Sequence, residues 1–305
     1  MVSFLAANRL EEQLASFYPR QHLSYVFEFR IKEDNDQVDL AMAFAEKNDL
    51  LFLQEEYAKK PNQKEVVDWL GDCFKLSKDN QQIKSFWIEA DLNGTQNDQI
   101  PSLFVSPKQQ FITFDEICYF VSVLSLSSKN EQEDDLLKEC LEALEEGQYI
   151  EHLGVMHSRG KTKTTRMYIR GFDSKSLFTF LNRINWPGNK EVLATQLIYM
   201  NQTAYISVAV EYNKDWLPTI GVEFHLKNGS QYCEAFLSIL QKSGLCTTQR
   251  VAAIMDVLRP QKIKSNGATY KRGLSHFKIN IDKDGAIEPK VYVQLIPDYL
   301  SILGF

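Results

Sequence analysis

The sequence predicts an α+β fold in which an antiparallel β-barrel of about ten strands is surrounded by helices. Three observations favour it. Helical patterns alternate with pairs of period-two patterns along the chain. The short connections within the pairs favour hairpins, which need antiparallel neighbours, and about ten twisted strands tend to curl or close. No Pro-, Gly- or Ser-rich linker divides the chain, so we expect one domain over residues 1–305.

The helices are predicted first, from apolar residues at helical spacing. Thr113 and Glu116 form a capping-box pattern before the third helix, and Gly147 and Gly244 follow the fourth and the sixth. Helices that start and stop at such signals are expected between the strand pairs. The predicted ranges are 3–18, 64–76, 114–126, 134–146, 174–185, 230–243 and 247–258.

The strands are predicted from alternation of apolar and polar residues, mostly in neighbouring pairs. The first pair is joined across the turn "EDND", and the last two strands are close enough along the chain for a hairpin. The predicted ranges are 22–33 with 37–45, 84–92 with 102–106, 150–158 with 163–171, 193–200 with 204–212 and 217–226, and 271–282 with 287–295.

The alternation also predicts which side chains line the barrel. In a helix-covered barrel, the apolar face of each strand packs under the helices and the other face lines the lumen. The segment "TTRMYIRGF" places Arg166, Tyr168 and Arg170 on one face and Met167 and Ile169 on the other. Several strands repeat this division, so we expect a polar lumen. An antiparallel sheet with one face in solvent gives the same alternation and stays open as the alternative.

Composition narrows the class of protein. The chain has 305 residues, 34 basic and 40 acidic, with 44% hydrophobic and 24% charged residues, as in an ordinary soluble globular protein. The acidic balance argues against a nucleic-acid partner, and the first residues lack the pattern of a signal peptide. We expect a cytoplasmic protein with no membrane partner. The five cysteines form no C-x-x-C pair, and no P-loop, G-x-S-x-G or G-x-G-x-x-G pattern occurs.

The helix, strand, strand, helix rhythm and the polar lumen resemble the ABBA prenyltransferases, and especially their peptide-modifying cyanobactin branch. The resemblance covers most of the chain and implies a barrel of αββα repeats, the PT barrel. The segments that show the resemblance best are "FEFRIKEDNDQVDLAMAFAEK", "LGVMHSRGKTKTTRMYIRGF", "TQLIYMNQTAYISVAVEYNKDW" and "LSHFKINIDKDGAIEPKVYVQL".

The resemblance implies a role for individual lumen residues. A first-strand glutamate of the family lies near the acceptor nucleophile, and Glu28 matches it as the catalytic residue. Arg166 and Arg170 match basic residues that hold the prenyl diphosphate, and Lys278 and Lys290 are weaker matches for the same role. One departure concerns the second strand, which carries a basic lumen residue in the family, whereas "VDLAMAFA" offers Asp39, Ala41 and Ala43 on that face.

Elementary chemistry agrees with these roles. Fixed cations stabilise a diphosphate leaving group, and aromatic faces shield the allylic cation that forms as it departs. Tyr168, Tyr205 and Tyr292 are the predicted shielding residues, and the last of them also matches a family tyrosine. The predicted lumen is rich in carboxylates, which suggests a cationic acceptor such as a guanidinium, bound by Asp39, Glu211 and Glu223. The alternative is that these carboxylates only pair with lumen cations.

The predicted function is therefore a prenyltransferase of natural product biosynthesis. It moves a C5 or C10 group from dimethylallyl or geranyl diphosphate to an Arg, Tyr or Trp side chain of a ribosomal, cyclic peptide, with Mg²⁺ accompanying the diphosphate. Two alternatives stay open: a non-catalytic barrel that binds a peptide or lipid, and a metal-dependent peptide-tailoring enzyme using Glu223, His225 and His276. We expect no metal site built by the protein alone, because ligand spacing gives it no support.

Overall fold

The computed structural model of the chain describes most of the predicted strands and helices. The described residues are 24–32, 38–44, 51, 54–55, 57–59, 64–79, 83–91, 102–108, 113–125, 131–157, 163–257, 259, 261–265 and 268–298. The predicted helix 3–18 lies outside these residues, as does the turn "EDND".

The described strands form one antiparallel sheet in the order β11-β1-β2-β3-β4-β5-β6-β7-β8-β10-β9. A further pairing of β11 with β10 closes the sheet, so ten strands make a barrel. The remaining strand, β9, pairs with the first residues of β10. The prediction of an antiparallel barrel of about ten strands is confirmed. The strands are β1 Ser24–Arg30, β2 Val38–Phe44, β3 Ile83–Asp91, β4 Ser102–Pro107, β5 Tyr149–Met156, β6 Thr164–Arg170, β7 Thr203–Tyr212, β8 Trp216–Leu226, β9 Gln261–Ser265, β10 Ala268–Ile281 and β11 Ile287–Pro297.

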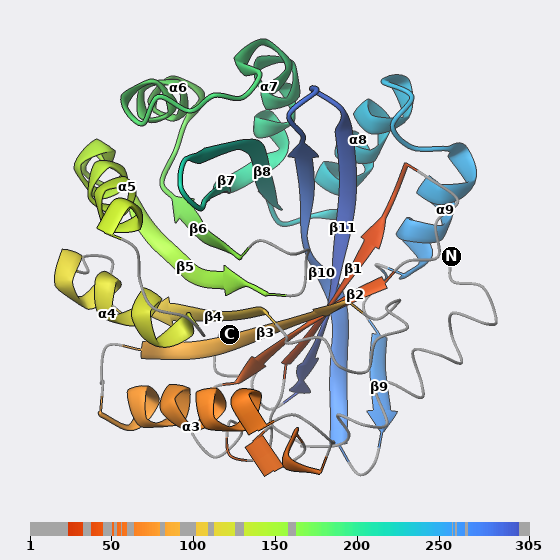
Figure 1. Cartoon of the computed structure of the whole chain (residues 1–305). Coiled ribbons are helices and arrows are strands. Elements are labelled where there is room, and N and C mark those ends of the chain that lie inside the picture. Colours follow the sequence, from red (N-terminus) through yellow and green to blue (C-terminus); the bar gives the residue numbers. More distant parts are fainter. Residues whose placement is uncertain are drawn as a thin grey trace.

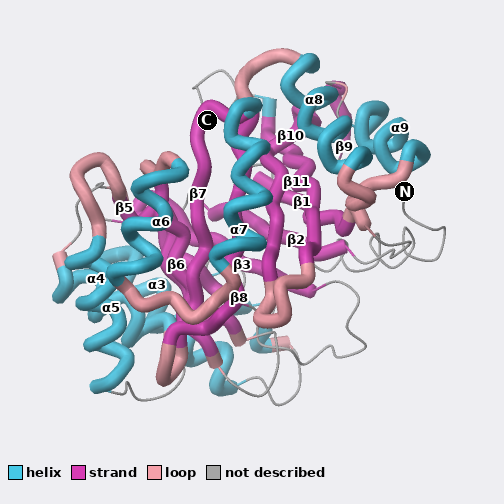
Figure 2. Tube along the Cα trace, turned by 90° about the horizontal axis from the view of Figure 1, so that it is seen from above, coloured by secondary structure: helices cyan, strands magenta, loops and turns pink. Residues whose placement is uncertain are grey.

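Helices surround this sheet on its outside (Figure 1), and the view from above shows helices beside the barrel with its strands between them (Figure 2). Within the described residues, no helix is both long enough and apolar enough for a membrane span. The predicted capping box of Thr113 and Glu116 is present at the start of α4. The helices are α3 Lys64–Asp79, α4 Phe114–Leu124, α5 Glu131–Ala143, α6 Ser174–Arg183, α7 Lys190–Gln196, α8 Ser230–Lys242 and α9 Thr248–Val257.

One predicted strand needs correction, and one observed strand was not predicted. Residues 193–200, predicted as a strand, lie in α7 and in the 3-10 helix η1 Leu197–Gln202. Asn189 caps α7, and Tyr199 packs on Phe236 of α8 with ring centroids 4.6 Å apart, so tertiary packing overrides the strand preference of an Ile-Tyr pair. The strand β9 was not predicted, because "QKIKS" is short and charged.

The main hydrophobic core lies between the outer face of the barrel and the helices. Phe27 of β1, Met167 and Ile169 of β6, and Phe277 of β10 are buried in it together with helix residues such as Phe236. These are the residues opposite the predicted lumen face on each strand. Burial of the apolar face under helices therefore directs the alternate, polar face into the barrel.

Gly154 marks a place where the barrel wall tolerates no side chain. It pairs with Phe104 across β4 and β5, and an added Cβ would lie 2.1 Å from the Phe104 Cδ1 and 2.6 Å from the Leu103 carbonyl oxygen. We expect Gly154→Ala to lower the free energy of unfolding by about 1–3 kcal/mol, measured by chemical denaturation. Gly273→Ala in β10 is the matched control, because nothing lies within 4 Å of its added Cβ. Equal stability of both variants would contradict the packing argument.

Candidate active site in the barrel lumen

The strand register brings the predicted site residues side by side. Glu28 pairs with Tyr292 on one side and with Asp39 on the other. Arg166 pairs with Glu211. Across β10, Lys278 pairs with both Glu223 and Lys290. All eleven predicted site residues lie on strands of the barrel, and all belong to the alternate faces that the main core does not use: Glu28, Asp39, Arg166, Tyr168, Arg170, Tyr205, Glu211, Glu223, Lys278, Lys290 and Tyr292.

The Glu28 carboxylate is the centre of one buried cluster. It accepts hydrogen bonds from the Lys290 ammonium on Oε1 and from the Tyr292 hydroxyl on Oε2. Lys290 is 2% exposed and also lies 3.3 Å from Oε2 of Glu288. Burial, together with the negative charge of Glu28, raises the pKa of Tyr292 well above its usual value. Tyr292 is thus a neutral donor, and Glu28 is an oriented carboxylate in a water-poor surrounding.

Arg166 forms a second cluster with two carboxylates. Its Nε and Nη2 donate to Oε1 of Glu211 at 2.8 and 2.5 Å, and its Nη1 lies 3.7 Å from Oε2 of Glu89. Nη1 also donates to the Tyr168 hydroxyl at 3.4 Å. Burial opposes the charge of Arg166, but Glu211 and its other neighbours outweigh that effect and hold its pKa well above the ordinary value. The guanidinium is therefore a permanent cation on this wall.

Lys278 links Tyr168 to Glu223. Its Nζ donates to the Tyr168 hydroxyl at 2.9 Å, lies 3.4 Å from Oε1 of Glu223, and sits 4.6 Å from the Tyr168 ring centroid. Burial opposes its charge, yet Tyr168 and Glu223 raise its pKa. The same surroundings act on Glu223: burial opposes ionisation, but His276 and Lys278 lower its pKa well below the usual value. A buried ion pair and a phenol thus face the lumen together.

Stacked rings cross four neighbouring strands. The Arg170 guanidinium carbon lies 3.3 Å above the Tyr205 ring, Tyr205 stacks on His225 at 4.3 Å, and His276 stacks on Tyr292 at 4.1 Å. The two histidine rings are 4.8 Å apart and tilted by 34°. Two of the three predicted cation-shielding tyrosines therefore stand at the ends of one column of aromatic rings.

Sequence reasoning missed an apolar part of the lumen. Phe104, Met156, Tyr168 and Ala209 form a separate buried cluster, against which Trp87 packs. Trp87 lies two residues before Glu89, and Phe104 alternates with Ser102 and Ser106, so the period-two rule applied to these strands would have found both. The lumen therefore contains an apolar, largely aromatic patch next to the polar clusters.

Two carboxylates, Glu151 and Glu288, were missed as well. Glu151 lies 3.3 Å from Nη1 of Arg170 and accepts a hydrogen bond of 2.5 Å from Ser207. It occupies an irregularity of β5, where the register shifts between Ile150 and His152. The shift breaks the alternation on which the prediction relied. Glu288 accepts a 2.7 Å hydrogen bond from Nε of Arg30.

In the described lumen, carboxylates outnumber cations, and each of the cations contacts at least one carboxylate. Asp39, on the strand where the resemblance led us to expect a basic residue, lies 3.9 Å from Nη2 of Arg30 on the neighbouring strand. The carboxylates are Glu28, Asp39, Glu89, Glu151, Glu211, Glu223 and Glu288. The cations are Arg30, Arg166, Arg170, Lys278 and Lys290.

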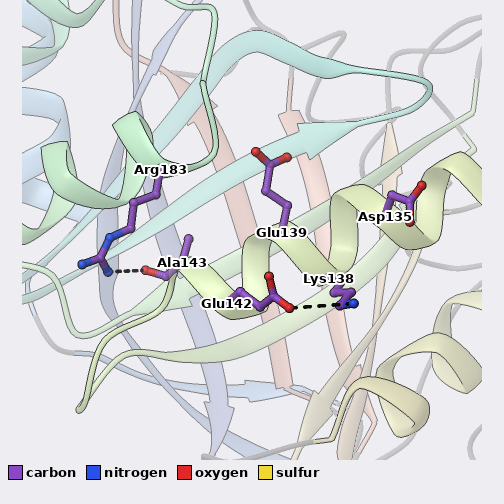
Figure 3. A pocket seen from close by; sticks show the side chains of 6 residues that line it. All are labelled: Asp135, Lys138, Glu139, Glu142, Ala143 and Arg183. Atoms are coloured by element: carbon purple, nitrogen blue, oxygen red, sulfur yellow. Dashed lines mark hydrogen bonds and ion pairs between the residues drawn. The ribbon is translucent and has the colours of Figure 1, made fainter.

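Surface hollows on the helices carry none of the predicted site residues. One of about 380 Å³ lies beside α5 and α6, and its side chains do not converge on a common point (Figure 3). There Arg183 donates to the Ala143 carbonyl at 3.0 Å, and Lys138 lies 3.9 Å from Glu142. Another, of about 460 Å³, lies beside α3 and α4. The chemistry-bearing side chains are concentrated in the lumen instead.

Neither a protein-family model nor a curated protein matches the sequence. Solved structures do match along nearly the whole chain. Prenyltransferase PriB in its apo form gives a TM-score of 0.58 at 9% identity, covering 96% of this chain and 90% of that one. 5-Dimethylallyltryptophan synthase from Streptomyces coelicolor gives 0.55 at 8%, covering 96% and 92%. AnaPT from Neosartorya fischeri gives 0.54 at 10%, covering 90% and 78%. These similarities establish the fold of the ABBA prenyltransferases.

Proposed function

We propose that this ABBA-fold barrel is a prenyltransferase that moves a C5 or C10 isoprenyl group from its diphosphate to a side chain of a peptide. The observation that carries the proposal is the joint presence, within one barrel, of an oriented Glu28 carboxylate, several cationic side chains and an aromatic patch. These are the parts that the reaction needs. Solved structures of the same fold include prenyltransferases, among them a complex with dimethylallyl thiolodiphosphate and L-tryptophan.

The cationic side chains bind the diphosphate of dimethylallyl or geranyl diphosphate. Arg166 and Arg170 present guanidinium forks with five donors each, so they can keep a carboxylate partner and still donate to a phosphate oxygen. Lys278 and Lys290 add point charges. Nη1 of Arg30 is buried without a hydrogen-bond partner among the described residues, which leaves one further donor for an anion.

The chemistry proceeds by loss of the diphosphate. The bond between C1 of the prenyl group and the diphosphate oxygen breaks, and its electron pair stays on that oxygen. The allylic cation that forms is shielded from water by the rings of Tyr168, Tyr205 and Tyr292. The apolar patch of Trp87 and Phe104 next to Tyr168 accommodates the hydrocarbon chain. The acceptor atom then forms its bond to the prenyl carbon, and Glu28 takes up the proton that the acceptor loses.

The acceptor that fits this lumen best is an arginine side chain, with tyrosine and tryptophan as the alternatives. Carboxylates outnumber cations in the described lumen, so a guanidinium would improve its charge balance. Asp39, Glu211 and Glu223 are the carboxylates assigned to acceptor binding. A ribosomal, cyclic peptide of the cyanobactin type is the proposed carrier, on the basis of the resemblance in sequence pattern.

We also propose that Mg²⁺ enters with the diphosphate. Mg²⁺ prefers oxygen ligands and is usually held by one or two carboxylates together with substrate phosphates. The lumen fits this requirement, because Glu89 and Glu211 flank Arg166, the cation assigned to the diphosphate. Either could supply an oxygen to the ion, whose role is to neutralise charge on the leaving group.

The test is mass spectrometry of reactions with purified protein, Mg²⁺ and either diphosphate, using matched cyclic and linear peptides that differ at one position. That position carries Arg, citrulline, Tyr or Trp; citrulline keeps the shape of Arg without its charge. We expect a mass gain of one prenyl unit, at least tenfold faster on Arg than on citrulline. Product on Tyr or Trp alone would refute the cationic acceptor, and peptide binding without product from either donor would favour a binding barrel.

A further inference from the structure

Three lumen side chains, Glu223, His225 and His276, converge on one point. The proposed reaction gives Glu223 a contact with the acceptor but gives the two histidines no task. Glu223 and His225 lie two residues apart on β8, and His276 lies on the neighbouring strand β10. Nε2 of His276 is 3.6 Å from Oε1 of Glu223, and Nε2 of His225 is 3.8 Å from Oε2. One ligand atom from each residue lies within 4.8 Å of the other two.

Hydrogen bonds of ordinary length do not account for this arrangement. Both separations from Glu223 exceed the reach of a hydrogen bond. Nε2 of His225 and Nε2 of His276 are both buried without a hydrogen-bond partner among the described residues. Buried polar nitrogens are nearly always satisfied in folded proteins, so two such atoms facing one carboxylate are positioned to bind a shared ligand.

Both imidazole rings are held by stacking, and His276 is also held as metal ligands usually are. His225 is stacked on Tyr205 and His276 on Tyr292, which limits the rotation of both rings. Nδ1 of His276 is 3.0 Å from the Ser275 hydroxyl, leaving Nε2 for another partner. A hydrogen bond to the second ring nitrogen is the common way in which proteins fix the tautomer of a ligating histidine. The register shift of β10 between Leu274 and His276 aligns this ring with Tyr292.

We propose that Glu223, His225 and His276 form a site for one divalent transition-metal ion of the Zn²⁺ class, which reverses the expectation drawn from ligand spacing along the sequence. Two imidazoles and one carboxylate, with an open position, are a ligand set that Zn²⁺ uses in catalytic sites. At metal–ligand distances of about 2.1 Å, shifts of roughly 1 Å would bring the three atoms into place. The site differs from the Mg²⁺ position, because Mg²⁺ prefers oxygen ligands and the new site offers two nitrogens.

Lys278 is compatible with the ion. Its Nζ is 3.4 Å from Oε1 of Glu223, which leaves Oε2 available to a metal. The ion places two positive charges in a lumen whose described carboxylates outnumber its cations, and its open position can take a diphosphate oxygen. This last step rests on the proposed prenyl transfer, whereas metal binding itself does not.

The experiment is a titration of chelator-stripped full-length protein with Zn²⁺, followed by calorimetry and by elemental analysis after desalting. We expect one equivalent per chain, with affinity reduced at least 100-fold in Glu223→Gln and His276→Gln. His152→Gln is the matched control, because His152 also lies in the lumen but binds Ser106 through Nδ1 at 2.7 Å. Should His276→Gln not fold, His225→Gln at the partly exposed ligand takes its place.

Absence of Zn²⁺ binding by the wild-type chain, or equal binding by the ligand variants and the control, would overturn the site. Prenyl transfer is assayed in parallel on stripped and Zn²⁺-loaded protein. Stoichiometric Zn²⁺ without turnover supports the site and contradicts the proposed transferase, while turnover by a chain that binds no Zn²⁺ contradicts the site alone. The two proposals can therefore fail independently.

Discussion

Glu28→Gln protein is expected to lose prenyl transfer by roughly 10²–10⁴-fold, the usual contribution of a positioned acid–base group. The substitution keeps the size of the side chain but removes its charge, and it places an amide group where Lys290 and Tyr292 both donate hydrogen bonds. The acceptor then loses the carboxylate that takes up its proton. The measurement is kcat and KM for an arginine peptide, with circular dichroism to confirm that the variant is folded.

A matched control distinguishes an effect at Glu28 from the effect of losing any one negative charge. Glu142→Gln removes a carboxylate that is 69% exposed on the surface helix α5, and is expected to leave the rate unchanged. Glu28→Asp keeps the charge on a shorter side chain and should retain more activity than Glu28→Gln. A fully active, folded Glu28→Gln protein would remove Glu28 from the mechanism.

The second large effect concerns stability. Arg166→Ala is expected to lower the free energy of unfolding by about 3–5 kcal/mol, because it removes the buried cation that Glu211 and Glu89 share. For a chain of 305 residues, each kcal/mol corresponds to a Tm shift of about 1.5–2 °C. Thermal and chemical denaturation of both proteins would measure the loss.

The control for this loss is Arg183→Ala. Arg183 also bridges a glutamate, Glu145, at 2.9 Å, but both side chains are more than 40% exposed, so a change of about 0–1 kcal/mol is expected. A double variant, Arg166→Met with Glu211→Gln, should recover part of the loss, since it removes the charge of Glu211 together with that of Arg166. Equal losses for both arginine variants would show that burial of the Arg166 cluster has no energetic consequence.

The sequence alone determined the architecture and the lumen faces of most strands. Period-two alternation is a local property, so it identified the lumen face of strands such as β6 and β11 without knowledge of their neighbours. Capping signals such as Thr113 with Glu116 located helix starts for the same local reason. The eleven residues assigned to the site all lie on these faces, whereas their catalytic and binding roles stay predictions.

Only the tertiary structure determined which residues contact one another in the lumen. Glu28 meets Lys290 and Tyr292 across more than 260 positions of sequence, because β11 closes the barrel beside β1. Register shifts placed Glu151 beside Arg170 and His276 beside Tyr292, which no alternation rule anticipates. Tyr199 became part of a 3-10 helix through packing on α8. Local periodicity specifies which way a side chain faces, but the closure and register of the barrel determine what it faces.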